Sequence, residues 1–320
     1  MPSTVLILGV AGRIGQALAG AFADAGWQVR AQSRKPLPAA LATRPLVHTV
    51  HCDALDAVAL HRAAQACDVV IHALNPPYTQ WDRLALPLVD AAIAAARVSG
   101  ALLMLPGNVY NFGRELPPLL TPDTPEQGNT AKARIRIEAE ARMAAAPGLD
   151  SVVIRAGDFF GGTEPGTWFD LALASKLNAG RFIYPGRTDI AHAWAYLPDL
   201  ARTFVRVAEQ RARLRGPNRL HFAGHTVTGE EMRRALKFAS GRPLRVGALP
   251  WWLFRLASPV VPLWRELLAM RYLWERPHRL DDHALVALIG AAPATPLQQA
   301  VSAALASSGL LRQDAGVAPA

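Results

Sequence analysis

The sequence predicts a doubly wound parallel α/β sheet (a Rossmann fold) followed by a smaller, mainly helical C-terminal lobe. Short apolar runs alternate with helical patterns through the first half of the chain. A glycine-rich turn joins the first apolar run to the first helical pattern, and the alternation loosens after the sixth run. Such alternation is typical of βαβ units, which place parallel strands in one buried sheet.

The first predicted strand is the unbroken apolar run Thr4–Leu8, as expected of a strand buried on both faces. The next helix repeats Ile14, Leu18 and Phe22 at every fourth residue and ends at Gly26. Further strands are expected at 27–32, 46–50, 68–72, 101–105 and 151–155, with helices at 58–65, 86–97 and 130–145. Residues 113–129, rich in proline, are expected to form a loop.

The pattern after residue 160 is less regular. A helix near 169–177 and a strand end at 194–197 are expected, and from Arg219 onward two further helices and the tryptophan-rich stretch 251–274. We predict a dinucleotide-binding domain over 1–160, the remaining sheet elements with a substrate-binding lobe over 161–312, and a flexible tail over 313–320.

Composition excludes several classes of protein. Of the 320 residues 51% are hydrophobic and 18% charged, which excludes wholesale disorder. Two cysteines, Cys52 and Cys67, cannot build a disulfide framework, and no leader-like apolar segment follows Met1, so we expect a cytoplasmic protein. No spacing of histidine, cysteine or carboxylate residues suggests a metal site.

The net charge of +9 raises the question of nucleic-acid binding. Lysine occurs only at four positions, so 34 − 4 = 30 of the basic residues are arginines, and they are scattered without a nucleic-acid motif. A solvated basic surface is the preferred interpretation. Prolines and arginines interrupt the stretch 251–274, so no membrane span is expected there; it could be a domain-packing or dimer surface, or an interfacial helix.

The turn after the first strand has the form G-x-x-G-x-x-G, with Gly9, Gly12 and Gly15 around Arg13 and Ile14. The first two glycines allow a tight turn and close approach of a pyrophosphate, and the third allows close helix–strand packing. Free N–H groups at the helix start would bind the phosphates. The flanking strand and helix make the turn a predicted dinucleotide site rather than an ordinary βα turn.

The end of the second predicted strand indicates which dinucleotide binds. An acidic residue there would favour NAD, but the chain reads Gln32, Ser33, Arg34 and Lys35. Arg34 can bind a 2′-phosphate, Ser33 can donate to it, and Arg13 can add a second cation nearby. We therefore predict NADP, with NAD the less favoured cofactor; the alternative is that Arg34 merely faces solvent.

With these segments in order, the chain resembles the short-chain dehydrogenase/reductase superfamily, and most closely its extended or atypical branch, also described as NAD-dependent epimerase/dehydratase-like. The resemblance implies that Asp53 and Ala54 contact the adenine, and that Ala73, Leu74 and Asn75 pass the cofactor riboses. It also implies that the segment of Asn108 and Tyr110 borders the substrate and that Asp158 approaches the nicotinamide. The segment 195–201 matches a later strand-to-helix junction.

The departures from the family concern catalysis. The family uses a tyrosine as acid/base, a lysine four residues later, and a serine or threonine that holds the substrate oxygen. Lys132 falls at the lysine position, which leaves Gly128 in place of the tyrosine and Pro106 in place of the hydroxyl residue. Lys132 is expected to bind the nicotinamide ribose, and Tyr110, near Asn108, is the candidate replacement proton donor. His192 and His221 are expected to be structural.

Two functions remain open. The first is an NAD(P)-dependent oxidoreductase or epimerase/dehydratase-like enzyme that acts on a small carbonyl or hydroxyl compound. The alternative is a non-catalytic NADP(H)-binding sensor or scaffold, favoured by the loss of the usual catalytic residues. A nucleic-acid binder is a distant third. A homodimer would be ordinary for the family that the chain resembles.

Overall fold

Seven parallel strands form the central sheet of the computed structural model, which describes residues 2–310. Their order is β11 (Pro217–Phe222), β7 (Ser151–Ala156), β5 (Leu102–Gly107), β4 (Val69–His72), β1 (Thr4–Leu8), β2 (Gln28–Ser33) and β3 (Val47–His51). After β3 the chain returns to the middle of the sheet and adds β4 on the other side of β1. The strand order therefore reverses between β1 and β4, which leaves a crevice at the carboxyl ends of these strands. The predicted parallel α/β fold is confirmed.

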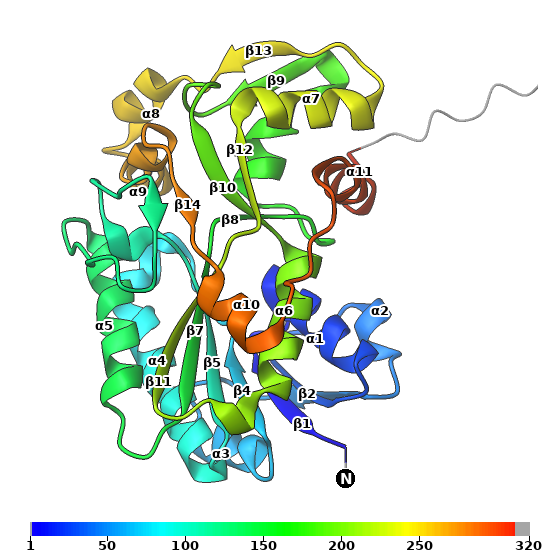
Figure 1. Ribbon diagram of the computed structural model, residues 1–320, viewed down its shortest axis with the longest axis vertical. Coiled ribbons are helices and arrows are strands. Elements are labelled where there is room, and N and C mark those ends of the chain that lie inside the picture. The colour runs from blue at the N-terminus through cyan, green and yellow to red at the C-terminus, as the bar shows by residue number, and fades with distance from the viewer. Residues whose placement is uncertain (1, 311–320) are drawn as a thin grey trace, which may run out of the picture.

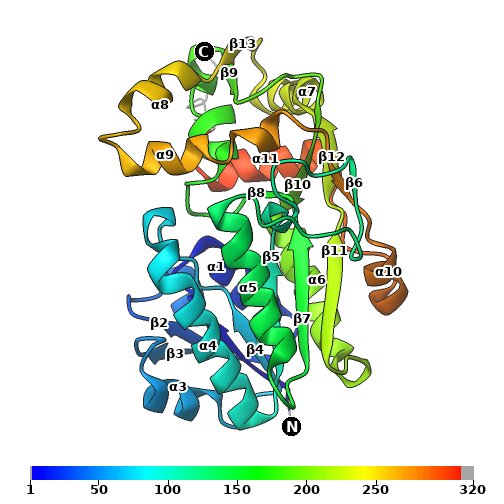
Figure 2. The ribbon, with the colours of Figure 1, turned by 90° about the vertical axis from the view of Figure 1, so that its left-hand side faces the viewer.

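Helices cover both faces of this sheet (Figure 2). One face carries α3 (Ala57–Ala64), α4 (Trp81–Ser99) and α5 (Ala131–Ala145), and the other carries α1 (Arg13–Asp24) and α6 (Leu197–Glu209). Leu6 and Leu8 of β1 belong to the hydrophobic core under α3, α4 and α5, and Val5 and Ile7 belong to the core under α1 and α6. This alternation explains why β1 is an unbroken apolar run.

The later part of the chain, apart from α6, β11 and α10 (His283–Ile289), forms the lobe in the upper half of Figure 1. It contains a sheet of β8 (Asp158–Phe160), β10 (Ala191–Tyr196) and β12 (His225–Thr228), and a pair of β9 (Arg181–Tyr184) and β13 (Arg245–Ala248). Its helices include α7 (Gly229–Ser240), α8 (Trp251–Ala257), α9 (Pro262–Leu268) and α11 (Leu297–Ser307). Aromatic side chains, among them Phe160, Trp194 and Trp274, fill its core.

Three expectations differ from the structure. Arg219, taken as the start of a helical region, lies within β11, and its neighbours Leu220 and Phe222 face the core of the main sheet. The helix expected near 169–177 is a five-residue π-helix, Phe169–Leu173, followed by a short 3₁₀ turn. The predicted loop 113–129 contains β6 (Leu119–Leu120), which pairs with β14 (Arg279–Leu280), a partner too distant in sequence to infer.

The tryptophan-rich stretch folds into α8 and α9, two short helices that pack on each other. Phe254 and Trp264 stack between them, with ring centroids 4.6 Å apart. On the outer side Trp252, Leu256 and Val260 are 70%, 72% and 80% exposed. Within residues 2–310 no helix has the length and apolar character needed to cross a membrane. The predicted tail over 313–320 lies outside the described residues.

Candidate active site

A cavity of about 770 Å³ lies at the carboxyl ends of the parallel strands and extends to the lobe. It brings together most of the residues that the sequence indicated: Gly9, Gly12, Arg13, Ile14, Ser33, Arg34, Asp53, Ala54, Ala73, Leu74, Asn75, Asn108, Tyr110 and Asp158. Gly15 and Lys132 do not line it. The cavity therefore joins the glycine turn, the end of β2 and the segment after β5 in one space.

The glycine turn is shaped as its spacing predicts. Gly9 has a backbone φ of +85°, a value that residues other than glycine rarely adopt. A Cβ at Gly15 would lie 2.4 Å from the carbonyl oxygen of Gly9, so only glycine allows α1 to begin this close to the turn. The turn thus has the cradle that a pyrophosphate needs at the start of a helix.

Gln32, at the end of β2, holds the glycine turn in place. The N–H of Gly9 donates to Gln32 Oε1 at 2.9 Å, and Gln32 Nε2 donates to the Cys52 carbonyl at 2.7 Å. The side chain is buried. In the sequence, Gln32 was notable only because no carboxylate stands at the end of β2. In the structure, its side chain connects the ends of β1, β2 and β3.

Arg34 and Asp53 mark the far end of the cavity. Their side chains are 74% and 49% exposed, and Arg34 Nη1 lies 3.4 Å from Asp53 Oδ2. The Ser33 hydroxyl donates to the Lys35 carbonyl at 2.7 Å. The Arg34 guanidinium is open to an anionic ligand, and no carboxylate occupies the end of β2 itself.

Arg13 connects the glycine turn to the lobe. Its Nε donates to the Glu164 carbonyl at 2.6 Å, and its side chain lies against Gly162 and Gly166. Burial lowers the pKa of Arg13, and the carboxylates of Asp170 and Glu164 act in the opposite direction. The loop over 161–167 therefore lies over the start of α1, and Arg13 points toward this loop.

Tyr110 and Tyr78 form a pair of phenols in the cavity wall. Their hydroxyl oxygens are 3.1 Å apart, and the backbone N–H of Tyr110 donates to Asn108 Oδ1 at 3.0 Å. Burial raises the pKa of Tyr78 and raises the pKa of Tyr110 well above its ordinary value, with the charge of Asp158 acting in the same direction on both. Both phenols are therefore protonated at neutral pH, and one of them donates to the other while the second O–H is available to a ligand.

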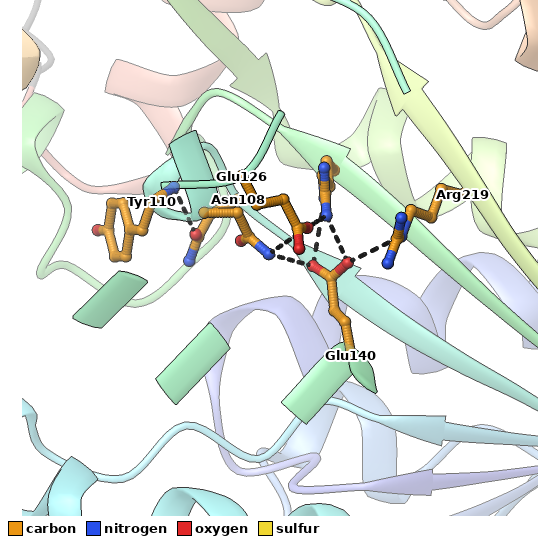
Figure 3. Close-up of polar contacts among 7 residues, drawn as sticks. Asn108, Tyr110, Glu126, Glu140 and Arg219 are labelled. Atoms are coloured by element: carbon orange, nitrogen blue, oxygen red, sulfur yellow. Dashed lines mark hydrogen bonds and ion pairs between the residues drawn. The ribbon is translucent and has the colours of Figure 1, made fainter. Parts of the chain in front are cut away.

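A buried ionic network supports the segment that carries Tyr110 (Figure 3). Arg155 of β7 is fully buried and pairs with Glu140 of α5, at 2.6 Å, and with Glu126. Asn111, next to Tyr110, donates to both carboxylates, and Arg219 lies 3.6 Å from Glu140. Asn111 is thus hydrogen-bonded to carboxylates that pair with Arg155 of β7, and these contacts fix the loop after β5 on the sheet.

Lys132 faces the lobe rather than the cavity. Its ammonium pairs with Glu266 of α9 and lies 4.8 Å from the centroid of the Tyr78 ring. Arg136, one helical turn further along α5, lines the cavity instead. Its Nε is buried and has no hydrogen-bond partner among residues 2–310, and its guanidinium lies 4.9 Å from the centroid of a Trp81 ring. Burial lowers the pKa of Arg136, although a guanidinium remains charged.

Sequence reasoning missed Arg136, although a signal was present. In the family that the sequence resembles, the catalytic lysine follows the tyrosine by four residues, which is about one turn of a helix. If Arg136 holds the cation position, then Lys132 holds the tyrosine position. The sequence contains a basic residue at each of these two positions, and only the packing of α5 shows which one enters the cavity.

His192, for which the sequence indicated no partner, has two hydrogen-bonding partners in the structure. Its Nε2 lies 2.9 Å from Asp158 Oδ2 and its Nδ1 lies 3.3 Å from the Leu273 carbonyl. The parallel pairing of β8 with β10 brings the two residues together, which sequence separation concealed. In the tautomer that carries its proton on Nε2, the His192 ring donates to the Asp158 carboxylate. His221 is buried, with Nδ1 3.0 Å from the Leu120 carbonyl.

Metal binding has no support in the described part of the chain. No group of three or more histidine, cysteine, aspartate or glutamate residues there could hold an ion. The cavity has four features: a glycine cradle, the exposed Arg34 at one end, a buried guanidinium with an unused donor, and a phenol pair. Fold and cavity together define a dinucleotide-binding Rossmann protein.

The family comparison agrees with this class. Residues 9–197 match the family model described as NAD(P)H-binding, which covers more than half of the chain. The chain belongs to this NAD(P)H-binding family. No curated protein matches the sequence.

Solved structures share the fold over nearly the whole chain. A UDP-glucuronic acid 4-epimerase from Bacillus cereus, in complex with NAD, is 16% identical with a TM-score of 0.75, covering 97% of this chain and 100% of that one. A UDP-glucose-4-epimerase from Stenotrophomonas maltophila with bound NAD is 17% identical, with a TM-score of 0.75 and coverages of 94% and 97%. The Bordetella bronchiseptica enzyme WbmH, in complex with NAD+, is 19% identical, with a TM-score of 0.74 and coverages of 96% and 98%. The fold is that of NAD-dependent epimerases.

Proposed function

We propose that this protein is an NADP-dependent oxidoreductase that acts on a small carbonyl or hydroxyl compound. The observation that carries the proposal is the single cavity that extends from the glycine turn and Arg34 to the Tyr78–Tyr110 pair. A dinucleotide bound along the strand ends would place its adenosine end near Arg34 and its reactive end near the phenols.

The choice of NADP rests on the end of β2. Arg34 is exposed at the cavity and can form charge-assisted hydrogen bonds with a 2′-phosphate. A 2′-hydroxyl would instead be matched by a carboxylate at the end of β2, where this chain has Ser33. Asp53, 3.4 Å from Arg34, orients the guanidinium in the absence of a phosphate.

Arg136 is the residue that we assign to the nicotinamide ribose. It is the cation of α5 that lines the cavity, and its buried Nε requires an acceptor. A ribose hydroxyl supplies such an acceptor. Lys132, the sequence candidate for this role, is already neutralised by Glu266.

A bound nicotinamide supplies or accepts a hydride in this proposal, and the side chains manage the oxygen of the substrate. The hydroxyls of Tyr110 and Tyr78 donate hydrogen bonds to the carbonyl oxygen, which gains negative charge as the carbonyl is reduced. Asp158 lines the cavity, and when the Asp158–His192 pair carries one proton beyond that of the neutral imidazole, it gives this proton to the oxygen and returns to a carboxylate and a neutral imidazole. The loop network of Arg155 and Glu140 keeps Tyr110 in position.

A non-catalytic NADP(H) sensor is the second candidate function. It is favoured by the absence of a tyrosine at both Gly128 and Lys132 and by Pro106 in the place of a hydroxyl residue. A sensor would retain the cradle and Arg34 but would not need a proton beside the phenols.

Titration of the protein with NADPH and NADH, followed by a turnover assay with small aldehydes, separates these functions. The oxidoreductase proposal expects tighter binding of NADPH and oxidation of NADPH that depends on Tyr110. Binding without oxidation of NADPH by any carbonyl compound supports the sensor. No binding of either nucleotide contradicts both functions.

A further inference from the structure

The lobe contributes an apolar wall to the cavity. Its lining side chains beyond Thr167 are Trp168, Leu171, Ala172, Leu249, Phe254 and Leu267. They come from the π-helix and the residue before it, from the segment before α8, and from α8 and α9. Trp81, Leu84 and Leu88 of α4 continue this surface on the Rossmann side. The substrate end of the cavity is therefore bounded by hydrocarbon and aromatic side chains from both halves of the chain.

Charged lining residues all come from the first half of the chain: Arg13, Arg34, Lys35, Asp53, Arg136 and Asp158. The proposed function already gives Arg34 to the 2′-phosphate and Arg136 to the ribose. Glu266 of α9, just behind the wall, is neutralised by Lys132. Within the described lining, the lobe thus offers neither a lysine nor an arginine to a substrate.

A nucleoside diphosphate would bind poorly at such a wall. A diphosphate carries at least two negative charges, and its burial requires cations or several converging N–H donors. This separates the site from those of fold relatives whose structures contain UDP-glucose or UDP-linked sugars.

We propose that the substrate is an uncharged carbonyl or alcohol compound with an apolar body, an aliphatic chain or an aromatic ring, which lies against the wall formed by Trp168, Leu171, Leu249, Phe254 and Leu267. This inference rests on the proposed oxidoreductase function for the position of the reacting carbonyl. The carbonyl faces the Tyr78–Tyr110 hydroxyls, and the apolar body extends toward α8 and α9. Burial of each methylene against such a wall strengthens binding by roughly fourfold.

Binding and turnover test the two parts of this inference separately. Hexanamide, octanamide and decanamide carry a carbonyl that is not reduced, so their affinity reports the wall alone. We expect affinity for the protein, with and without NADPH, to rise about fourfold per methylene along this series. UDP-glucose is expected to show no binding to the NADPH-loaded protein.

A matched pair of leucine variants locates the effect. Leu171 lines the cavity and is 67% exposed, and Leu256 does not line it and is 72% exposed, so glutamate at either position should be tolerated by the fold. Leu171→Glu should weaken decanamide binding at least tenfold and flatten the chain-length dependence, while Leu256→Glu should leave both unchanged. NADPH binding should be unchanged in both variants.

The outcomes are distinguishable. A chain-length series without a trend, or binding of UDP-glucose at the cavity, overturns the apolar substrate class. A rising series that Leu171→Glu flattens, together with no oxidation of NADPH by hexanal, octanal, decanal or benzaldehyde, supports the apolar site and overturns the oxidoreductase function. A rising series with kcat/KM for the aldehydes increasing in parallel supports both.

Discussion

Lys132 of α5 and Glu266 of α9 form an ion pair that joins the Rossmann half of the chain to the lobe. Their side chains are 6% and 23% exposed, so the pair is largely shielded from water. The same ammonium lies over the ring of Tyr78, which places the pair directly behind the phenols of the cavity. Lys132 is thus a positioning residue between α5, α9 and Tyr78.

Removal of one partner of this pair should destabilise the protein. Lys132→Ala leaves a shielded Glu266 without its cation, and we expect unfolding free energy to fall by about 3 kcal/mol. The double variant Lys132→Met, Glu266→Leu should recover much of this loss. Chemical denaturation measures the change, and NADPH affinity of the folded Lys132→Ala protein should change little. A large loss of NADPH affinity without a loss of stability would instead make Lys132 a cofactor residue.

Arg34 should determine the preference between the two dinucleotides. Arg34→Ala removes a charged donor to the 2′-phosphate, and we expect NADPH affinity to fall about tenfold while NADH affinity is nearly unchanged. Calorimetric titration with each nucleotide measures the ratio. Arg97→Ala, an exposed arginine on α4 away from the cavity lining, serves as the control. Equal losses for both nucleotides in the Arg34 variant would contradict the assignment.

Arg136 should affect both dinucleotides alike, because a ribose hydroxyl is common to NADPH and NADH. Arg136→Met is expected to weaken binding of each by about tenfold, with partial recovery in Arg136→Lys. The same titrations measure this. An Arg136 variant that binds both nucleotides normally would exclude a ribose contact and return Lys132 to consideration.

The phenols should act as protonated donors over a wide pH range. Burial raises the pKa of Tyr78 and the pKa of Tyr110, so neither ionises until well above neutral pH. We expect Tyr110→Phe to lower kcat about a hundredfold, with a smaller effect of Tyr78→Phe. The kcat profile of the unaltered protein should show no step from a phenol below about pH 10. A kcat that increases through a tyrosine ionisation near neutral pH would contradict this role.

Three buried histidines should make stability fall in acid. Burial lowers the pKa of His72 and of His278 to about 3, and the pKa of His221 to about 4. The unfolded chain takes up these protons near pH 6.5, so it binds more protons than the folded chain at pH 5. Stability is therefore full above about pH 6.5 and falls as the pH decreases toward the folded-state pKa values.

Denaturation at pH 7 and pH 5 measures this effect. Each histidine is expected to account for about 2 kcal/mol of the difference in unfolding free energy between neutral solution and pH 5. His278→Gln should reduce the difference by that amount, whereas replacement of the exposed His48 with glutamine should not. A pH dependence that is the same in His278→Gln and in the parent protein would disprove the burial of a neutral imidazole at that position.

Much of the Rossmann half could be predicted because its signals are local. The apolar run of β1, the glycine spacing of the turn and the four-residue repeat of α1 each lie within a dozen residues. Strand limits differ by a residue or two, because hydrogen bonds to neighbouring strands and not side-chain character decide where a strand ends.

The missed features depend on contacts between distant segments. β11 contains Arg219 and His221, which reduce its apolar character, and it becomes a strand because it pairs with β7 at the edge of the sheet. The Asp158–His192 contact needs the pairing of β8 with β10. Lys132 and Arg136 can be told apart only when the position of α9 is known. Glu266 of α9 forms an ion pair with Lys132, whereas Arg136 remains available to line the cavity.

Transfer of deuterium from NADPH tests the central claim most directly. The protein would be incubated with NADPH that carries deuterium at both C4 positions of the nicotinamide and with the aldehyde series, and the products analysed by mass spectrometry. The account predicts one deuterium on the former carbonyl carbon of the product, with the yield reduced about a hundredfold in Tyr110→Phe. Tight binding of NADPH with no deuterium in any product would contradict it and leave the protein as a sensor.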